Sequence, residues 1–551
     1  MTGPVIDRRS ALALIGAGAA LPAAGQAATP AAASFAHGVA SGDPATDGAI
    51  LWTRVTTDAA AVPVRWSVAE SEGGKPVASG TAEARAARDH TVKVEAGRLK
   101  PGRDYWYWFE AAGTRSPVGR FRTLPEGKAA DVVMAVVSCQ LYANGLFNAY
   151  DAIAREARLD AVVHLGDYIY EYDPLDYGGA NARALNRLVK PDHEIVTLAD
   201  YRARHASYKT DADLQAAHAR AAFICVWDDH ETANDSWTGG AENHQPATEG
   251  DWKARKAAAI QAYFEWMPIR DPIPGKTWES INRSFQFGDL ATLLMVETRL
   301  LARSQQADEV VKPVDAASIA AVLKERARPD REMLGPPQRS WVEQELKASV
   351  AAGRPWQVLG NQVVMARVPG PDIVKLAGPE KAAAMLAALP PAVATRLKTA
   401  QAGFRAGLPY NLDSWDGYPP ARQRLYESFR AAGSRPLVLS GDSHAFWAND
   451  LFDDGGALVA VEFGTSSITS PSVGDSLSGV PLGQMLEAAG EEVVFCDQRA
   501  KGYILLTLTP ERARADYVAV STILAKPYEA RRIAAFEARA ADKGSRLTRL
   551  G

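Results

Sequence analysis

Four hydrophobic segments of this chain each run directly into a cluster of polar side chains. The clusters are Ser138-Cys139-Gln140, Gly166-Asp167-Tyr168-Ile169-Tyr170, Asp228-Asp229-His230-Glu231 and Gly441-Asp442-Ser443-His444. A buried strand holds the residues just beyond its end rigidly, so neighbouring strands can bring several such clusters to one point. Carboxylate, imidazole, thiol and phenol groups that converge in this way can bind metal ions. The pattern therefore predicts an active site where the ends of several strands lie side by side.

The chain is too long for a single hydrophobic core. It has 551 residues, of which 47% are hydrophobic, so we expect two domains or one large domain with a smaller partner. Its 61 basic and 65 acidic side chains give a formal net charge of -4, which produces no long-range field to attract nucleic acid or an anionic membrane. We expect a small or locally recognised substrate and no sequence-specific nucleic-acid partner.

Three cysteines, Cys139, Cys225 and Cys496, are too few and too scattered for a disulfide framework. Cys139 lies in the first polar cluster, where a thiolate could bind a metal ion. A buried thiol beside the site is the alternative.

Residues 1–33 have the features of a twin-arginine export signal. Asp7-Arg8-Arg9-Ser10 precedes an apolar run over residues 11–24, and small residues suited to cleavage follow at residues 25–28. The run is too short to span a bilayer. We expect the twin-arginine machinery to export the folded protein, which would then be periplasmic or secreted. An ordinary charged N-terminus is the alternative.

Residues 34–126 show short alternating runs separated by turn signals. The runs include residues 49–54, 63–68 and 105–110, and a linker near residues 124–127 closes the segment. This spacing predicts a small all-β sandwich domain of the immunoglobulin or fibronectin kind.

From residue 130 to residue 525 apolar strands alternate with helical stretches, which is typical of an α/β domain, here with a mixed sheet. Strands are predicted at residues 132–137, 161–165, 222–227, 356–359 and 437–439. Helices are predicted at residues 148–158, 211–220, 252–266, 337–349 and 421–432. Residues 283–287 and 291–296 are predicted to form a hairpin.

Two further segments have helical composition. Residues 379–404 are rich in alanine and predict a helical insertion, and residues 530–549 predict a charged helix within a C-terminal tail over residues 526–551. No later stretch is apolar enough to cross a membrane.

The second cluster suits a two-metal phosphoester site. At such a site two cations about 4 Å apart neutralise the phosphate oxygens and turn a bridging water into hydroxide. Asp167 could bridge both metals, and Tyr170 could reach one of them through a turn at Gly166, since a phenolate favours a ferric ion. A Gly-Asp pair after a strand is alone more often an ordinary turn.

The third and fourth clusters strengthen this interpretation. Four ionisable residues at 228–231 follow an apolar strand, where unpaired charges would be costly to bury without a metal, although a surface acidic turn is the alternative. Asp442 and His444, two apart on an extended segment, point to the same side. Ser443 could instead be the nucleophile of a serine esterase, but no histidine after the adjacent His444 is available as its base.

In this order the four clusters resemble the metallophosphoesterase superfamily, and with the N-terminal segment they resemble the alkaline phosphatase D (PhoD-like) family. Further similar blocks are Phe35-Ala36-His37-Gly38-Val39-Ala40-Ser41-Gly42-Asp43-Pro44, Leu51-Trp52-Thr53-Arg54, Trp356-Gln357-Val358-Leu359-Gly360-Asn361-Gln362 and Trp415-Asp416-Gly417-Tyr418-Pro419. The resemblance covers nearly the whole chain after the signal. It implies a layered metallophosphatase-type α/β sandwich with mixed sheets.

The resemblance also implies roles for individual residues. Asp167 would bridge the metals and His230 would assist the leaving group or the transition state. The implied metal ligands are Cys139, Asp167, Tyr170, Asp229, Asn361, Asp442 and His444. Several of these replace the ligands usual in the superfamily, and carboxylate, amide and thiolate in place of imidazole shift the preference from zinc towards Fe³⁺ and Ca²⁺.

The substrate is predicted less closely. Arg299 could bind the phosphate, but an arginine paired with a structural carboxylate is equally consistent, and Asn234 could line the site. We predict an exported phosphatase or phosphodiesterase acting on a small-molecule, lipid or polymer phosphoester. A serine esterase and a non-catalytic cell-envelope binding protein are the alternatives.

Overall fold

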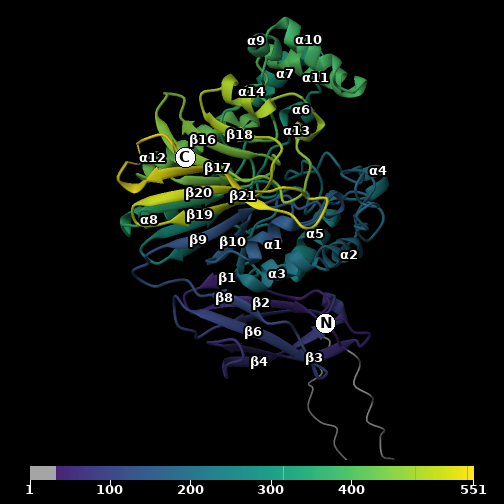
Figure 1. The fold of residues 1–551 in the computed structure, drawn as a ribbon, viewed down its shortest axis with the longest axis vertical. Coiled ribbons are helices and arrows are strands. Elements are labelled where there is room, and N and C mark those ends of the chain that lie inside the picture. Colours follow the sequence, from purple (N-terminus) through teal and green to yellow (C-terminus); the bar gives the residue numbers. More distant parts are fainter. Residues whose placement is uncertain (1–32, 314, 478, 543) are drawn as a thin grey trace, which may run out of the picture.

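The computed structural model describes residues 33–551 apart from residues 314, 478 and 543. The predicted export signal therefore lies outside the described residues, except for its last position. Helices α9 (Ile373–Ala377), α10 (Pro379–Ala387) and α11 (Pro391–Arg405) lie at the end of the molecule opposite the N-terminal strands (Figure 1). They confirm the predicted helical insertion.

Most strands belong to two large sheets. The first sheet has the order β22-β21-β20-β19-β9-β10-β11-β1-β2-β5 and the second the order β12-β13-β14-β15-β17-β16-β18. The strands of the first sheet are β1 (Val39–Ala45), β2 (Gly48–Arg54), β5 (Thr91–Ala96), β9 (Val132–Val137), β10 (Ala161–His164), β11 (Ala222–Cys225), β19 (Lys501–Leu508), β20 (Arg512–Val520), β21 (Ala530–Arg539) and β22 (Thr548–Arg549). Those of the second are β12 (Arg283–Phe287), β13 (Ala291–Met295), β14 (Trp356–Gly360), β15 (Leu437–Ser440), β16 (Phe446–Phe452), β17 (Leu458–Gly464) and β18 (Val493–Asp497). The predicted strands and the β12–β13 hairpin are confirmed.

The longer helices are α1 (Asn148–Ala154), α2 (Leu198–Tyr208), α3 (Ala212–Arg220), α5 (Trp252–Trp266), α7 (Ala316–Arg326), α8 (Gly335–Ala351), α12 (Pro419–Ala431) and α14 (Leu482–Ala489). The five predicted helices are confirmed as α1, α3, α5, α8 and α12, whereas α2, α7 and α14 were not predicted. Short helices are α4 (Pro246–Glu249), α6 (Ala307–Val310) and α13 (Val473–Ser476), with 3-10 turns η1 (Ala86–Arg88), η2 (Tyr142–Asn144), η3 (Trp415–Gly417) and η4 (Ala540–Asp542). α1 ends four residues before the predicted boundary.

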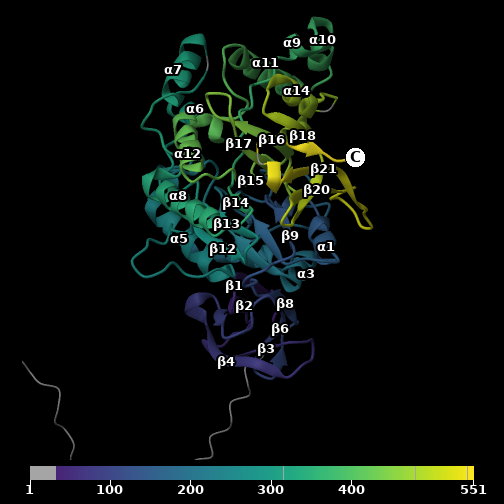
Figure 2. The same cartoon turned by 90° about the vertical axis from the view of Figure 1, so that its left-hand side faces the viewer.

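The two large sheets pack face to face with helices outside them (Figure 2). Val163 of the first sheet and Val358 of the second belong to one buried cluster, which also contains Ile153 of α1. A second cluster joins Leu359 to Leu346 of α8 and Phe429 of α12. This is the layered α/β arrangement with mixed sheets that the sequence predicts.

The parallel strands set the position of the site. β9, β10 and β11 are parallel, and so are β13, β14 and β15. Parallel neighbours end at the same edge, so the segments after them lie together. A parallel bridge between Ser138 and Ser467 joins the ends of the two sheets at that edge.

The N-terminal segment forms the predicted sandwich, but one of its sheets is shared. β3 (Ala61–Ala69), β4 (Pro76–Arg85), β6 (Asp104–Ala111), β7 (Thr114–Arg115) and β8 (Gly119–Arg122) form a separate sheet that packs on β1, β2 and β5. β1 pairs in parallel with β11, so these three strands extend the first large sheet. Asp43, which is buried, also pairs with Arg283 of β12 at 2.7 Å.

The predicted C-terminal helix is wrong. Residues 530–549 instead contain strand β21, the turn η4 and the short strand β22. β21 pairs antiparallel with β20 and buries Phe536 against Tyr517 at a ring-centre distance of 5.6 Å. Alanine, arginine and glutamate favour helices locally, but sheet pairing and burial of an aromatic ring override a weak local propensity.

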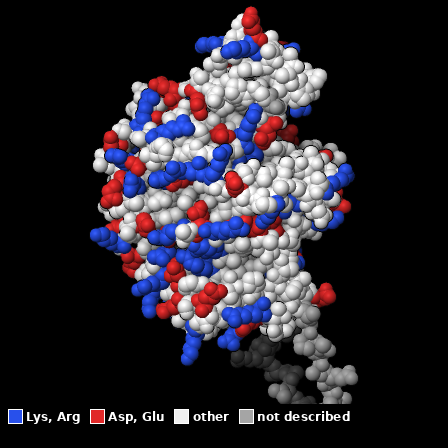
Figure 3. Space-filling view, in the orientation of Figure 1, with Lys and Arg blue, Asp and Glu red and all other residues white. Residues whose placement is uncertain are grey.

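The outer surface carries both signs of charge. Lysine and arginine are interspersed with aspartate and glutamate over the face that Figure 3 shows. Among the described residues, no helix combines the length and apolar character that crossing a membrane requires.

Candidate metal centre

Four residues of the predicted site have left-handed backbone conformations. φ is 59° for Cys139, 57° for Asp167, 59° for Asp442 and 57° for His444. This region costs a residue with a side chain about 1 kcal/mol or more and is concentrated at functional sites. The strain turns the chain sharply just after β9, β10 and β15.

Two glycines let these loops approach one another. Gly166 has a φ of 110°, and a Cβ there would lie 2.4 Å from the Cβ of Asp228. A Cβ on Gly441 would lie 2.6 Å from Oγ of Ser138. Only glycine fits these contacts without moving a neighbouring loop.

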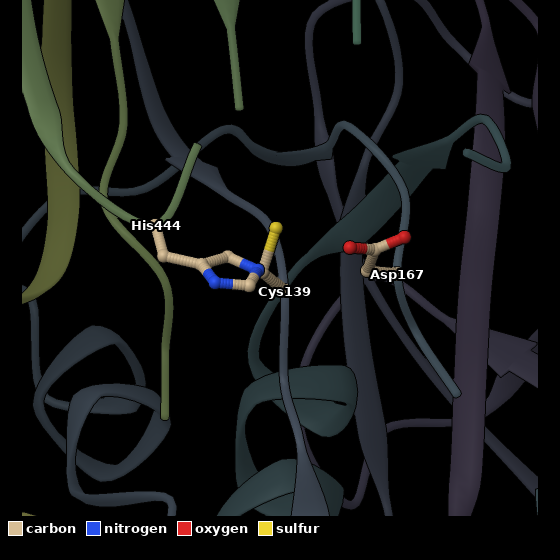
Figure 4. A group of neighbouring side chains, drawn as sticks. All are labelled: Cys139, Asp167 and His444. Atoms are coloured by element: carbon tan, nitrogen blue, oxygen red, sulfur yellow. The ribbon is translucent and has the colours of Figure 1, made fainter. Parts of the chain in front are cut away.

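Three overlapping groups of side chains could each hold a metal ion. Their ligand atoms lie within 4.8 Å of one another in each group. The groups are Cys139, Asp167 and His444; Asp167, Asp229 and His230; and Asp228, Asp229 and Asp442. Figure 4 shows the first group, with the Cys139 sulfur beside the His444 ring and the Asp167 carboxylate on a separate loop. Asp167 and Asp229 each belong to two groups, so either could bridge neighbouring ions.

Tyr170 and His444 are oriented towards this centre. The Tyr170 hydroxyl lies 3.1 Å from Oδ2 of Asp167, 2.7 Å from Oγ of Ser470 and 3.3 Å from Nε2 of His444. Nδ1 of His444 donates to the Pro471 carbonyl at 2.8 Å, which leaves Nε2 as the ligand nitrogen. Burial lowers the pKa of His444 to about 3, so the imidazole is neutral, as a metal ligand must be.

Arg299 is the buried counter-ion of the acidic residues. Its guanidinium is fully buried and contacts Asp228, Asp413 at 2.9 Å, and Asp229 and Asp442 at 3.4 Å each. Its described contacts are thus with carboxylates, which favours the structural alternative. Phosphate binding by Arg299 stays a prediction.

The pKa values of the four aspartates of the three ligand groups shift in different directions. Burial raises the pKa of Asp167 and Asp442 well above the usual range, and neighbouring carboxylates add to this effect. Burial also raises the pKa of Asp228 to about 6, although Arg299 opposes it. Burial would raise the pKa of Asp229 too, but Arg299 and His230 hold it at about 2.

The residues fit a cation. Oδ1 of Asp167, Oδ2 of Asp228 and Oδ1 of Asp229 are buried and make no hydrogen bond to any described residue, although Oδ1 of Asp229 lies 3.4 Å from the Arg299 guanidinium. Burial raises the pKa of the Cys139 thiol and the Tyr170 phenol well above their usual ranges, so their anions require a nearby positive charge. Bound metal ions would supply that charge and satisfy the free oxygens.

His230 has an acidic partner. Its Nδ1 lies 2.7 Å from Oε2 of the buried Glu171. Burial lowers the pKa of His230, but Glu171, Asp229 and Asp167 outweigh burial and raise it well above its usual range.

Glu231 holds two loops together. Its carboxylate accepts hydrogen bonds from the backbone N–H groups of Asp167 at 3.0 Å and Asp228 at 2.8 Å, and from that of Tyr168. Glu231 therefore links the loops of the second and third clusters through hydrogen bonds to their backbones.

Three other predicted residues lie at or beside the centre. The Asn361 side chain is buried, accepting from Nε1 of Trp415 at 2.9 Å and donating to the Val363 carbonyl. The half-buried Asn234 follows His230 and donates its backbone N–H to Glu171 at 2.7 Å. Oγ of Ser443 accepts from Nε1 of Trp447 at 2.7 Å, and no histidine bond to it occurs among the described residues. Roles for Asn361 and Asn234 stay predictions.

The sequence assigned no individual role to five residues of the site: Glu171, Asp228, Glu231, Asp413 and Ser470. Glu171 and Asp228 lie in or beside quoted clusters, so their acidic character was a usable signal. Asp413 stands two residues before the Trp415 block and contacts Arg299, Arg303 and Gln306. Ser470 offers no signal in the sequence, because only folding brings it to Tyr170.

Comparison with known proteins agrees with this geometry. Residues 134–517 match the family model described as PhoD-like phosphatase, and residues 20–125 match its N-terminal domain. Alkaline phosphatase D of Bacillus subtilis (strain 168) is 35% identical over 502 residues, covering 88% of this chain and 77% of that protein. A solved structure of PhoD matches with a TM-score of 0.76 at 32% identity, covering 96% of this chain and 94% of the other. The resemblance inferred from the sequence is confirmed, and the chain belongs to the PhoD-like phosphatase family.

Proposed function

We propose that this protein hydrolyses phosphoric esters at metal ions held between the ends of its two large sheets. Family membership supports the reaction class, a phosphoric ester hydrolase, since the similar Bacillus protein is an alkaline phosphatase. The observation that carries the metal-dependent mechanism is the overlap of three ligand groups at Asp167 and Asp229. Bridging carboxylates hold neighbouring cations close together, as phosphoester hydrolysis at a two-metal site requires.

The donor types suggest which ions bind. Cys139, Tyr170 and His444 would join Asp167 around Fe³⁺, because a phenolate and a thiolate suit that ion. The remaining predicted ligands are Asp229, Asn361 and Asp442, to which the geometry adds Asp228. Their oxygen donors suit Ca²⁺. When bound, the ions would neutralise phosphate oxygens and activate a water molecule.

The chain's own residues orient the reaction. Arg299 holds three of the acidic side chains in place, and Glu231 fixes the backbones that carry Asp167 and Asp228. His230 would donate a proton to the leaving oxygen. No covalent serine intermediate is needed. The Ser443 hydroxyl accepts a hydrogen bond from the Trp447 indole.

The cellular setting is part of the proposal. Residues 1–33 would direct export by the twin-arginine route to the periplasm or the medium. Residues 34–126 would form the N-terminal module, and the catalytic domain, predicted at residues 130–525, would also include strands β21 and β22 of the first large sheet. Small-molecule, lipid and polymer phosphoesters all remain substrates to be tested, with Asn234 and Arg299 beside the site.

Metal analysis combined with two variants tests the function. Purified wild-type protein should contain iron and calcium and should hydrolyse 4-nitrophenyl phosphate or its diester, with loss of activity on chelation. Asp167→Asn should lose bound metal and turnover, whereas Ser443→Ala should keep most of both. The reverse result would favour the serine esterase, and no turnover by metal-loaded wild type would favour a binding protein.

A further inference from the structure

A cavity of about 730 Å³ lies between the N-terminal module and helix α5. The module contributes Ala87 and Arg88 of η1 to its lining, and the other lining residues belong to α5 and to the loop before β12. The lining shares no residue with the three ligand groups of the metal centre. Cavities of this size accommodate small organic ligands.

Ion pairs and hydrogen bonds join the walls of the cavity. Arg202 of α2 pairs with Glu265 of α5 at 2.7 Å and donates to the Ala87 carbonyl at 2.9 Å, so it fixes the module against the helix. Lys256 of α5 pairs with Glu279 at 3.0 Å, which ties the loop before β12 to the same helix. The shape of the cavity is therefore set by contacts between three separate segments of the chain.

The cavity has an aromatic surface. Phe264 is buried, and the ring of Trp278 meets it edge-on at a ring-centre distance of 5.1 Å. Lys93 of β5 donates to the Phe264 carbonyl at 2.8 Å, which holds this part of α5 on the module. Trp278 itself is 51% exposed. An exposed indole beside a cavity offers a flat apolar surface on which a sugar ring or an aromatic ring can pack.

The unpaired charges of the lining are positive. Both of its glutamates take part in the ion pairs described above. Arg88 and Lys253 are exposed and form no ion pair with any residue that the structure describes. A guanidinium and an ammonium group both bind phosphate, sulfate and carboxylate oxygens. On a chain whose net charge is -4, this local excess of positive charge favours an anionic ligand.

We infer that this cavity is a second binding site, which takes a ligand with a flat ring and an anionic substituent. The ring would pack on Trp278, and the anionic group would pair with Arg88 and Lys253. Sugar phosphates and nucleoside phosphates share this chemistry. A simple crevice between two domains would show no preference for a ligand that combines the two features.

A titration of full-length protein labelled with 5-fluorotryptophan tests the site. The chain has 13 tryptophans, and Trp278→Phe identifies the ¹⁹F resonance of Trp278 as the one that disappears. The probes are glucose 6-sulfate and adenosine 5′-sulfate, because a sulfate ester keeps the ring and the charge without being a phosphoester. At least one probe should shift the Trp278 resonance to saturation. The probe that binds more tightly shows whether the ring is a saccharide or a nucleobase.

Three simpler probes separate the two features. Inorganic sulfate lacks the ring, and glucose and adenosine lack the charge, so each should bind at least about tenfold more weakly than the better sulfate ester.

Matched variants locate the charge contribution. The double variant Arg88→Gln, Lys253→Gln should weaken binding of the better sulfate ester by about tenfold. Lys398→Gln, at an exposed position of α11, should leave the affinity unchanged. All three side chains are exposed, so the unfolding temperature should stay at the wild-type value.

Four results would overturn the inference. Absence of a saturable shift with either sulfate ester would mean that the cavity binds no such ligand. Equal binding of inorganic sulfate would remove the role of the ring, and equal affinity in the double variant would remove the role of the charges. Loss of the shift in Asp167→Asn would place the ligand at the metal centre instead. None of these measurements uses turnover, so their outcome is independent of the proposed phosphatase function.

Discussion

The ammonium group of Lys209, next to the end of α2, lies 4.5 Å from the centre of the Trp52 ring on β2. It also donates to the Tyr168 hydroxyl at 2.9 Å, one residue beyond Asp167. The buried Lys209 side chain thus connects the N-terminal module to the loop that carries Asp167. Burial lowers its pKa to about 7.

The buried histidines near Lys209 predict that the free energy of unfolding falls steeply as the pH is lowered. Burial lowers the pKa of His37 and His164 to about 3 and that of His205 and His218 well below the usual value. The charge of Arg54 adds to this effect at His37, and the charge of Lys209 adds to it at all four histidines. The unfolded chain binds these protons at a pH of about 6.5. The stability that these histidines contribute is therefore complete above that pH and is lost as the pH falls below it, by about 1.4 kcal/mol per pH unit for each histidine.

Urea unfolding at pH 7, 6 and 5 measures this slope. His205→Phe removes one of these histidines, so it should reduce the slope by about 1.4 kcal/mol per pH unit. Leu524→Ala, a change at a non-titratable side chain that is 50% exposed, should leave it unchanged. Equal slopes for wild type and His205→Phe would contradict the prediction.

Removal of Arg299 should destabilise the metal-free protein strongly. Arg299→Met leaves Asp228, Asp229 and Asp442 without their shared cation, and an uncompensated buried charge costs about 3 to 5 kcal/mol. Bound metal ions would replace part of the lost charge, so the loss should be smaller in metal-loaded protein. Chemical unfolding with and without metal measures both values.

A surface arginine serves as the control for that experiment. Arg405 is 49% exposed and pairs with Asp372 at 3.1 Å. Arg405→Met should cost about 1 kcal/mol or less, with or without metal. If Arg299→Met were equally mild, the counter-ion role would be wrong.

Gly166→Ala should disrupt the centre. Its Cβ would overlap Asp228, whose backbone nitrogen lies 2.5 Å away, in addition to the strain at a φ of 110°. The variant should lose metal content and turnover together. Gly113→Ala, at a φ of 81° with nothing within 4 Å, should cost about 1 kcal/mol and keep both properties. Normal metal content in Gly166→Ala would show that the loops can separate without harm.

The C-terminal strand should be part of the folding unit. Phe536 of β21 is fully buried and packs on Tyr517 and on Phe495 at 5.6 Å each. Phe536→Ala should reduce the free energy of unfolding by about 3 to 5 kcal/mol. Leu524→Ala, at a side chain that is 50% exposed, should change it by about 0.5 kcal/mol or less. If Phe536→Ala changed the free energy of unfolding as little as Leu524→Ala, β21 would not be part of the cooperative folding unit.

Local patterns were sufficient for the strand ends and the predicted ligand types. β9, β10 and β15 are short apolar runs, and Cys139, Asp167 and Asp442 follow their ends within three residues, so both signals lie within a short stretch of sequence. The hairpin of β12 and β13 was predictable for the same reason. The C-terminal strand was not, because its composition favours a helix and its partner Tyr517 becomes relevant only once β20 is in place.

The sequence by itself determined the residue types that end each strand, and hence the family and the prediction of a metal centre. The tertiary structure decided their partners: Arg299 between four aspartates, Glu171 on His230, Ser470 at Tyr170, and a first sheet that includes part of the N-terminal module. The physical reason is the separation along the chain over which each kind of interaction acts. Strand propensity and turn chemistry act between neighbours in the chain. Hydrogen bonds, charge pairing and burial join residues that are 59 to 300 positions apart, and folding alone brings these into contact.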